Sequence, residues 1–364
     1  MKYKSIYVAA SSQHVGKTTS TLGLVSNFMR KGLKVGYCKP VGQQYMDLGK
    51  LRVDKDTLLF MDLIHFNVVP EVHSPVILGH SDVTDYIENP DQFDPVGSLL
   101  YAKEQLEEQN ELVIYEGTGH PGVGSVANLS NARVAQMMNA GLILVVEGGI
   151  GSTIDMLNLS LSMFREKKLP IFGIIVNKVI PDKMEKVAYY VGKYLTSKNL
   201  PLLGVIPYDK SLAYPVMRTI AKAVKGKVMY NAEMITNKIE DIIAGSLLHT
   251  QNWTHANDLL LVVATNRFEG AINRITRGID QYKLETCPIT GVVVCGDGDL
   301  DETSLDFINR ENIPLIRTKL DTFGSVIRIS QIEVKINRST PWKINKAIEL
   351  IRENIHLENL LVEV

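Results

Sequence analysis

Apolar residues in this chain fall into short runs that alternate with longer segments of mixed apolar and polar residues. Short apolar runs bounded by turn residues are typical of buried parallel strands, and the longer segments are typical of helices. The runs predict strands at 6–8, 36–38, 112–115, 142–146, 171–176 and 202–206. The segments between them predict helices at 20–30, 58–65, 96–109, 153–165, 183–198 and 212–224. Repeated strand–helix units predict an α/β fold, with a parallel sheet covered by helices on both faces.

From residue 226 the pattern loosens, and then strands and helices alternate again. A helix at 233–245 is expected to lead into elements at 259–263, 268–281, 290–295, 304–311, 313–316, 322–330 and 343–355. A chain of 364 residues suits two domains, which we expect at 1–225 and 226–364, the second a smaller α/β domain. The second block carries no further Gly-Lys-Thr and no cluster of metal ligands in its sequence, so it indicates no chemistry by itself.

The loop at residues 9–19 joins the first predicted strand to the first helix and contains Gly16-Lys17-Thr18. Such a loop points backbone N–H groups at an anion, its lysine reaches the outer phosphates, and its threonine hydroxyl is placed to bind magnesium. The full motif has glycine where this chain has Ser11, and the alternative is an ordinary helix N-terminus capped by Thr18 or Thr19. The flanking strand and amphipathic helix favour a phosphate-binding loop. We expect its nucleotide contacts from Gln13, His14, Val15, Gly16, Lys17, Thr18 and Thr19.

Two charged residues end predicted strands, at the edge where open parallel sheets bind ligands. Lys39 is followed by Pro40, which stops the strand, so its ammonium either holds a phosphate or carboxylate or lies solvated at the strand end. Glu116 follows a buried apolar run and opens a glycine-rich turn. A lone carboxylate is costly there unless it is paired or metal-bound, so Glu116 is a magnesium candidate. The alternative is that N–H groups of its own turn satisfy it.

Other polar residues near strand ends extend this picture. Asp47, Asp54 and Asp56 lie in a polar stretch ahead of the second helix, and one of them is placed to reach magnesium, although acids ahead of a helix are also good caps. Asn177 ends another strand, and its amide offers both a donor and an acceptor to an adenine edge. A guanine-reading Asn-Lys-x-Asp motif needs aspartate at the position of Ile180. ATP is therefore the expected nucleotide rather than GTP.

The composition argues against several classes of partner. Charged residues make up 22% of the chain and its net charge is −1, so we expect no overall attraction to nucleic acid or to an anionic membrane. The first residues show no secretory pattern, and no apolar run approaches the length that spans a bilayer, so we expect a cytoplasmic protein. Cys38, Cys287 and Cys295 have neither metal-ligand spacing nor the even number of a disulfide set, so we expect reduced thiols.

Four stretches together resemble the dethiobiotin synthetase branch of P-loop proteins, to which the cobyrinic acid a,c-diamide synthases are related. They are residues 10–18, Lys39-Pro40-Val41, Glu116-Gly117 and Gly204-Val205-Ile206-Pro207. That branch tolerates a hydroxyl residue in place of the first glycine, as at Ser11. The chain resembles still more the N-terminal region of long bacterial phosphotransacetylases, in which a dethiobiotin-synthetase-like domain precedes a smaller domain named for an Asp-Arg-Thr-Gly-Gly (DRTGG) motif. The resemblance covers nearly the whole chain.

The resemblance implies a set of site residues and an assembly. The implied magnesium ligands are Thr18, Asp56 and Glu116. The implied phosphate-facing catalytic lysines are Lys17 and Lys39. Asn177 and Pro207 are implied to border the adenine. A homodimer is implied as well. The chain also departs from these families, because Ser12 and His14 stand where dethiobiotin synthetase has its loop acids, and the DRTGG motif itself is absent. We expect neither an acetyltransferase domain nor a glutamine amidotransferase domain within these 364 residues.

Three functions are compatible with the sequence. The first is a regulatory protein that binds Mg-ATP, hydrolyses it slowly if at all, and signals through its second domain to another protein. The second is an ATP-dependent ligase of the dethiobiotin synthetase or cobyrinic acid a,c-diamide synthase type, which activates a carboxylate as an acyl phosphate beside Lys39. The third is a P-loop fold kept only for assembly. Retention of the lysines and acids argues against the third, and loss of the loop acids argues against the second; a small carboxylate or metabolite ligand suits the first two.

Overall fold

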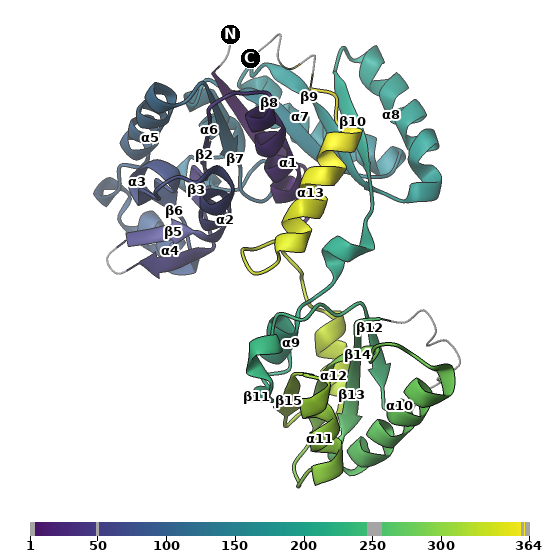
Figure 1. Ribbon diagram of the computed structural model, residues 1–364. Coiled ribbons are helices and arrows are strands. Elements are labelled where there is room, and N and C mark those ends of the chain that lie inside the picture. Colours follow the sequence, from purple (N-terminus) through teal and green to yellow (C-terminus); the bar gives the residue numbers. More distant parts are fainter. Residues whose placement is uncertain (1–3, 49–50, 246–256, 358–359, 361–364) are drawn as a thin grey trace. The chain divides into compact units, whose positions relative to one another are not determined.

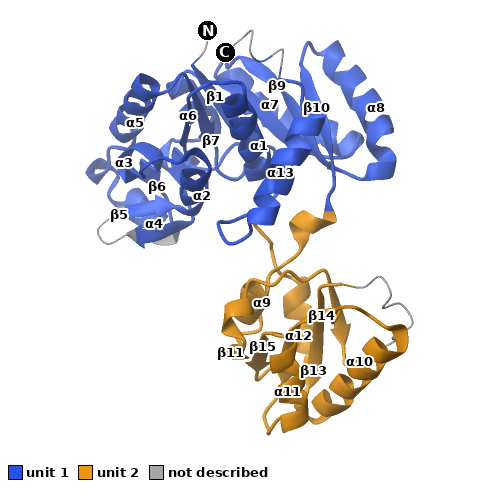
Figure 2. Ribbon diagram, in the orientation of Figure 1, with its two compact units in different colours: residues 1–209, 336–364 blue, residues 210–335 orange. Residues whose placement is uncertain are grey.

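The structure is a computed structural model that describes residues 4–48, 51–245, 257–357 and 360. The chain forms two compact units, coloured blue and orange in Figure 2. Unit 1 comprises residues 1–209 and 336–364, and unit 2 comprises residues 210–335. Each unit is built on a main sheet of its own with helices on both faces, as Figure 1 shows.

Unit 1 is built on a six-stranded sheet in which every neighbouring pair of strands is parallel. The order across the sheet is β10 (Leu202–Pro207), β9 (Ile171–Val179), β8 (Gly141–Glu147), β1 (Ser5–Ala10), β7 (Leu112–Glu116) and β2 (Val35–Cys38). These strands are nearly continuous apolar runs because both faces of the sheet are buried. The predicted parallel α/β sheet is confirmed, and the strands lie where the apolar runs placed them.

Helices cover both faces of this sheet (Figure 1). One face packs against α5 (Pro95–Gln109), α6 (Asn131–Met137), α7 (Gly151–Glu166) and α8 (Met184–Ser197). The other face packs against α1 (Lys17–Arg30) and α13 (Pro341–Asn354). Successive strand residues point to opposite faces, so Tyr7 and Ala9 of β1 join the core beneath α5 to α8. Each strand therefore contributes side chains to two cores.

The segment between β2 and β7 adds a small subdomain to unit 1. It contains the parallel pair β3 (Val41–Gly42) and β6 (Val76–Ile77), the hairpin β4 (Tyr45–Leu48) and β5 (Leu51–Asp54), and the helices α2 (Lys55–Ile64), α3 (Pro70–His73) and α4 (His80–Glu88). Strand β5 runs directly into α2, whose first turn carries Asp56. This connection therefore places Asp54 and Asp56 at the N-terminal end of α2.

Unit 2 is a second, smaller α/β unit. Its five-stranded sheet has the order β11 (Lys227–Tyr230), β15 (Leu315–Thr318), β14 (Ile289–Cys295), β13 (Leu259–Ala264) and β12 (Asp241–Ala244). All pairs are parallel except β11 with β15. One face packs against α10 (Phe268–Tyr282) and α11 (Glu302–Arg310), and the other against α9 (Met217–Ala223) and α12 (Thr322–Ser330). The predicted second α/β block is confirmed.

One predicted element of unit 2 is wrong. Instead of a helix at 233–245, the chain forms a short 3-10 turn at Ala232–Met234 and then strand β12. Ile239 and the pair Ile242-Ile243 are three and four residues apart, which imitates one face of a helix. In the structure, Ile242 and Ile243 lie in a parallel pairing with β13. Pairing with a neighbouring strand therefore outweighs the local pattern here.

The last helix belongs to unit 1, although the sequence placed it in the second domain. Helix α13 forms near its predicted position but packs on α1 and β10. A Cβ at Gly23 of α1 would lie 2.2 Å from the Cβ of Ile351, so the two helices approach this closely only because Gly23 has no side chain. The compact units thus differ from the expected division at 225, because unit 2 ends at residue 335 and the chain then returns to unit 1.

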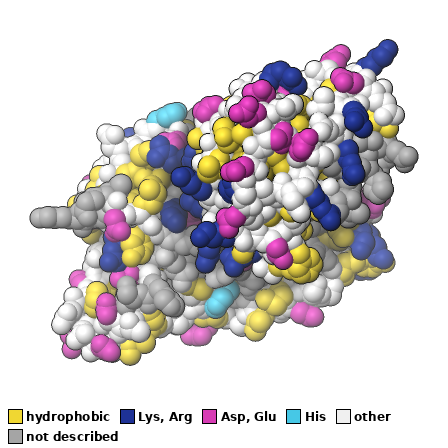
Figure 3. Space-filling view, turned by 90° about the horizontal axis from the view of Figure 1, so that it is seen from below, with side chains coloured by type: hydrophobic (Ala, Val, Ile, Leu, Met, Phe, Trp, Pro, Cys, Tyr) yellow, Lys and Arg dark blue, Asp and Glu magenta, His cyan; other side chains and the backbone are white. Residues whose placement is uncertain are grey.

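The surface carries both signs of charge. Lys and Arg side chains are interspersed with Asp and Glu over the face seen in Figure 3, in keeping with the net charge of −1. Among the residues described, no helix combines the length and the apolar character that crossing a bilayer requires.

The buried lysine of α13 gives a stability prediction. Lys343 is 0% exposed, and burial lowers the pKa of its ammonium from 10.5 to about 8. The unfolded chain therefore holds this proton more tightly, and the free energy of unfolding rises as the pH increases from about 8 to about 10. Lys343→Met is expected to raise that free energy at pH 7 by about 2 kcal/mol and to remove the rise. Urea unfolding at both pH values tests this, with Lys186→Met on the exposed side of α8 as control.

Candidate functional site

The loop between β1 and α1 has the backbone geometry of an anion cradle. The N–H of Ser11 donates to the carbonyl of Val145 in β8 (3.0 Å), which fixes the start of the loop against the sheet. His14 (φ 61°) and Gly16 (φ 100°) are left-handed. Helix α1 then begins at Lys17, and no side chain among the described residues caps its first turn. Its first N–H groups are therefore available to an anion.

Asn177 lies directly beneath this loop. It is near the carboxyl end of β9, is 5% exposed, and donates from Nδ2 to the carbonyl oxygen of Val15 (2.7 Å). A Cβ at Gly16 would lie 2.0 Å from that same Nδ2, so the close approach requires glycine. The sequence did not predict this contact. The predicted place of Asn177 and Pro207 beside adenine stays a prediction, and Pro207 does end the neighbouring strand β10.

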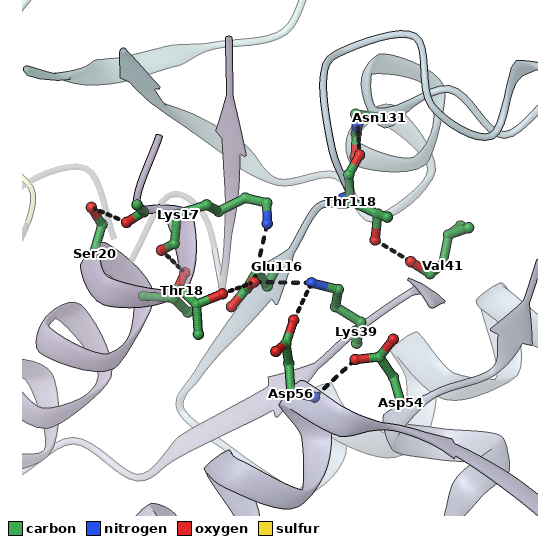
Figure 4. A network of polar contacts seen from close by, with 12 residues as sticks. Lys17, Thr18, Ser20, Lys39, Val41, Asp54, Asp56, Glu116, Thr118 and Asn131 are labelled. Atoms are coloured by element: carbon green, nitrogen blue, oxygen red, sulfur yellow. Dashed lines mark hydrogen bonds and ion pairs between the residues drawn. The ribbon is translucent and has the colours of Figure 1, made fainter. Parts of the chain in front are cut away.

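Glu116 is the centre of the polar side chains at this sheet edge, as Figure 4 shows. It ends β7 and is 0% exposed. Its Oε1 accepts from three donors: Lys17 Nζ at 3.1 Å, Thr18 Oγ1 at 2.9 Å and Lys39 Nζ at 2.9 Å. The hydroxyl of Tyr37 approaches the other oxygen at 3.5 Å. The sequence left open whether the N–H groups of its own turn satisfy this carboxylate, and the structure shows side chains from other elements meeting it.

The acidic stretch ahead of α2 divides into a cap and a site residue. Asp54 accepts from the N–H of Asp56 at 2.9 Å and thereby caps α2. Burial raises the pKa of Asp54 to about 6. Asp56 instead meets Lys39, with 2.7 Å between Oδ2 and Nζ. Asp47 lies 3.8 Å from Arg52 on the exposed hairpin. Asp56 is therefore the member of this stretch that joins the group around Glu116.

The two lysines differ in how firmly they hold their protons. Burial by itself would lower the pKa of Lys39, but Asp56 and Glu116 outweigh it and hold that pKa well above its usual range. For Lys17, burial lowers the pKa and repulsion by Lys39 adds to this, against the attraction of Glu116. Lys39 is therefore a fixed cation between two carboxylates, and the charge of Lys17 is less strongly held.

The donor set fits a magnesium ion. Thr18, Asp56 and Glu116 offer hydroxyl and carboxylate oxygens, which are the ligands Mg²⁺ prefers. Thr18 Oγ1 and Glu116 Oε1 lie 2.9 Å apart, the separation of two adjacent ligands about 2.1 Å from an octahedral ion. Within the described part of the chain, no group of three or more His, Cys, Asp or Glu residues is arranged to hold a metal. A metal here would therefore need further oxygens from phosphate and water.

A second buried network, which the sequence analysis missed, shapes the turn after Glu116. Asn131, at the start of α6, accepts from the Tyr7 hydroxyl (2.7 Å) and from the N–H of Thr118 (3.0 Å). Its amide donates to the carbonyls of Thr118 (2.8 Å) and His120 (2.7 Å). The only sequence signal is a polar Ser-Asn pair before a helical segment. These bonds fix the path of the turn that follows the site carboxylate.

The predicted site residues can now be placed. Lys17, Thr18, Lys39, Asp56 and Glu116 converge, from five positions spread over 100 residues. Gln13 and His14 are exposed at the tip of the loop, Val15 is buried, and Thr19 is half-buried in α1. Whether these residues contact a nucleotide or a metal stays a prediction.

Comparison with known proteins identifies the family. A family model described as an AAA domain matches residues 4–216, which is more than half of the chain. The chain belongs to this AAA-domain family. A second model, described as a DRTGG domain, matches residues 219–332 of this AAA-domain protein, although the sequence lacks the motif that gives the domain its name.

Full-length relatives agree with the resemblance seen in the sequence. The phosphate acetyltransferase of Synechocystis sp. is 21% identical over 98% of this chain and 51% of that protein. The probable cobyric acid synthase of Methanocaldococcus jannaschii is 28% identical over 58% of this chain and 46% of that protein. The chain thus spans about half the length of these relatives. Among solved structures, the chain is similar to the MinD cell division protein of Aquifex aeolicus, with 14% identity and a TM-score of 0.38. The match covers 58% of this chain and 84% of the MinD chain.

Removing the charge of Glu116 tests whether the cluster stabilises the fold. Glu116→Gln leaves Lys39 buried with one carboxylate instead of two, so we expect the free energy of unfolding at pH 7 to fall by about 3 kcal/mol. The matched control is Glu147→Gln at the end of the neighbouring strand β8, where the carboxylate is exposed and 3.8 Å from Lys178. That change should cost less than about 1 kcal/mol. Equal losses in urea unfolding would show that the cluster has no special role.

Proposed function

We propose that unit 1 binds Mg-ATP at this sheet edge and that the protein is a regulatory nucleotide-binding protein with little hydrolysis of its own. The supporting observation is the convergence of Lys17, Thr18, Lys39 and Asp56 on Glu116, beside a helix start whose N–H groups are available. Cations, oxygen ligands and backbone donors are the three parts that a triphosphate with its metal requires.

Binding would rearrange contacts that the structure shows. The ammonium of Lys17 would exchange Glu116 for the outer phosphates, and the first N–H groups of α1 would donate to phosphate oxygens. Thr18, Asp56 and Glu116 would hold the magnesium ion, which supplies charge neutralisation on the phosphates. Lys39 would stay paired with Asp56 and Glu116 and would neutralise part of their charge. Asn177 would hold the loop from below.

ATP rather than GTP is proposed as the nucleotide. The chain has Ile180 where a guanine-reading motif needs an acid. Pro207 ends β10, Asn177 lies near the carboxyl end of the adjacent strand β9, and we propose that both border the adenine. Both residues lie on the side of the sheet beyond β8, away from Lys39, so the base and the metal would occupy different sides of the loop.

The second domain and the relatives support a regulatory role. The DRTGG-type unit is a separate α/β body, and the full-length relatives include phosphate acetyltransferases. We propose that unit 2 transmits the nucleotide state of unit 1 to an enzyme that makes or uses acetyl phosphate. The replacement of the loop acids of dethiobiotin synthetase by Ser12 and His14 also argues against a diamine substrate.

The ligand-binding lysine can be tested directly. Lys17→Ala removes the only lysine or arginine of the loop at residues 9–19, so we expect the dissociation constant for ATP with magnesium to rise about 100-fold, which corresponds to roughly 2.7 kcal/mol. Isothermal titration calorimetry measures it. Lys186→Ala, on the exposed side of α8, should bind as the unaltered protein does. If Lys17→Ala kept its affinity, the proposed nucleotide site would be wrong.

A second candidate function, the ATP-dependent ligase, is favoured by one observation, the strongly charged Lys39 beside the phosphate loop. A ligase would release ADP only when a carboxylic acid is supplied. We expect no more than about one ADP per minute per chain, below the median enzyme turnover by about two to three orders of magnitude, with formate, acetate, propionate or no acid added. Acid-dependent ADP release would replace the regulatory proposal with the ligase.

A further inference from the structure

Unit 2 is an insertion within the nucleotide-binding unit. The chain leaves unit 1 after Asp209, close behind β10, and re-enters it at Ile336, ahead of α13. We call residues 336–357 the return segment. In the sequence it follows directly after Lys335, the last residue of unit 2. Any change in unit 2 that reaches its C-terminal end is therefore passed to the return segment by the covalent chain.

The start of the return segment is held to α2. Arg338 donates to Asp62 through both Nε and Nη2, with 3.0 Å from Nη2 to Oδ1. A forked arginine–carboxylate pair fixes orientation as well as distance. Arg338 sits in a closed turn, because Asn337 accepts from the N–H of Thr340 (3.0 Å) and donates its own N–H to the Thr340 hydroxyl (3.1 Å). The turn therefore presents Arg338 to α2 in one defined position.

The middle of the return segment is packed on α1. Ile351 of α13 is 0% exposed and fills the space over Gly23, where a Cβ would lie 2.2 Å from the Ile351 Cβ. Because the Ile351 side chain rests on the backbone of α1 at Gly23, a shift of α13 cannot be absorbed there by a rotamer change in α1. Helix α1 is thus directly coupled to α13.

The end of the return segment is attached to the sheet edge. Ile355 forms an antiparallel bridge with Gly204 of β10, and the N–H of His356 donates to the carbonyl of Leu203 (3.0 Å). Lys346 of α13 also lies 3.5 Å from Asp209, the residue at which the chain leaves unit 1. The segment is therefore held at its start, middle and end.

Both helices that the return segment grips begin with site residues. Helix α1 starts with Lys17 and Thr18, and the first turn of α2 carries Asp56. Each contact with the return segment, at Gly23 and at Asp62, lies six residues further along the same helix. A helix moves as a rigid rod over such a length, so a displacement of its first turn appears at the contact.

We propose that the return segment couples nucleotide occupancy in unit 1 to unit 2, with Arg338 as a positioning residue that acts through α2 on Asp56. Nucleotide with magnesium would draw Lys17 from Glu116 to phosphate, and Thr18 and Asp56 to the metal. These movements would displace the first turns of α1 and α2. The return segment follows both helices and shifts the end of unit 2. Because coupling is reciprocal, a ligand on unit 2 changes the ATP affinity by the same factor that ATP changes the affinity for that ligand.

The proposal rests on the proposed ATP site and is tested in the full chain by hydrogen exchange with and without ATP and magnesium. Bound nucleotide is expected to slow exchange at least about threefold in peptides covering 336–355. Arg338→Ala should abolish this protection at 336–345. It should also raise the dissociation constant for ATP about threefold, which matches the free energy that an exposed ion pair usually contributes. The double charge reversal Arg338→Asp with Asp62→Arg should restore both, which a role in folding alone would not produce.

Controls separate this coupling from the site itself. Arg310→Ala removes an exposed arginine–glutamate pair of unit 2 (3.1 Å) and should change neither readout. Asp62→Asn repeats the test from the α2 side and should behave as Arg338→Ala does. If ATP binds but exchange at 336–355 is unchanged, the coupling is overturned and the proposed function stands. If the unaltered protein does not bind ATP, both are overturned.

Discussion

One buried carboxylate oxygen determines how this site is built. Oε1 of Glu116 is cut off from water and would be costly to bury alone, so three donors must meet it. The strand order supplies them: β7, which ends in Glu116, lies between β1 and β2. The loop after β1 brings Lys17 and Thr18 from one side, and the end of β2 brings Lys39 from the other. The charge cluster is thus a consequence of the sheet order.

The sheet, and most residues of the cluster around Glu116, could be predicted from sequence because their signals are local. Buried parallel strands are continuous apolar runs, and the Gly16-Lys17-Thr18 turn stands between a strand and a helix. Glu116 and Lys39 were found because each ends such a run. The predicted helix at 233–245 is wrong because its local signal is misleading. The spacing of Ile239 and Ile242 imitates a helix, and only pairing with β13 makes residues 241–244 a strand.

The remaining features depend on contacts between distant residues, which one sequence does not reveal. Asn177 donates a hydrogen bond to Val15, which is 162 residues away in the sequence, and Arg338 donates to Asp62, which is 276 residues away. Nothing around Gly23 shows that Ile351 will lie against it, so the return of α13 to unit 1 was unpredictable. Asn131 has the sequence signature of an ordinary helix start, yet it holds the turn after Glu116. What distinguishes these residues is a contact with a residue distant in the sequence, and no local sequence pattern shows such a contact.

The unequal electrostatics of the two lysines favour regulation over ligation. Lys39 is held by two carboxylates that raise its pKa, so turning it toward a substrate carboxylate would break two ion pairs and leave both acids poorly neutralised. Lys17 has a lowered pKa and one carboxylate partner, so moving it to a phosphate exchanges one anion for another. The resting cluster therefore resists the movement that a ligase needs and permits the movement that nucleotide binding needs. A binding protein that changes shape with its nucleotide requires only the second.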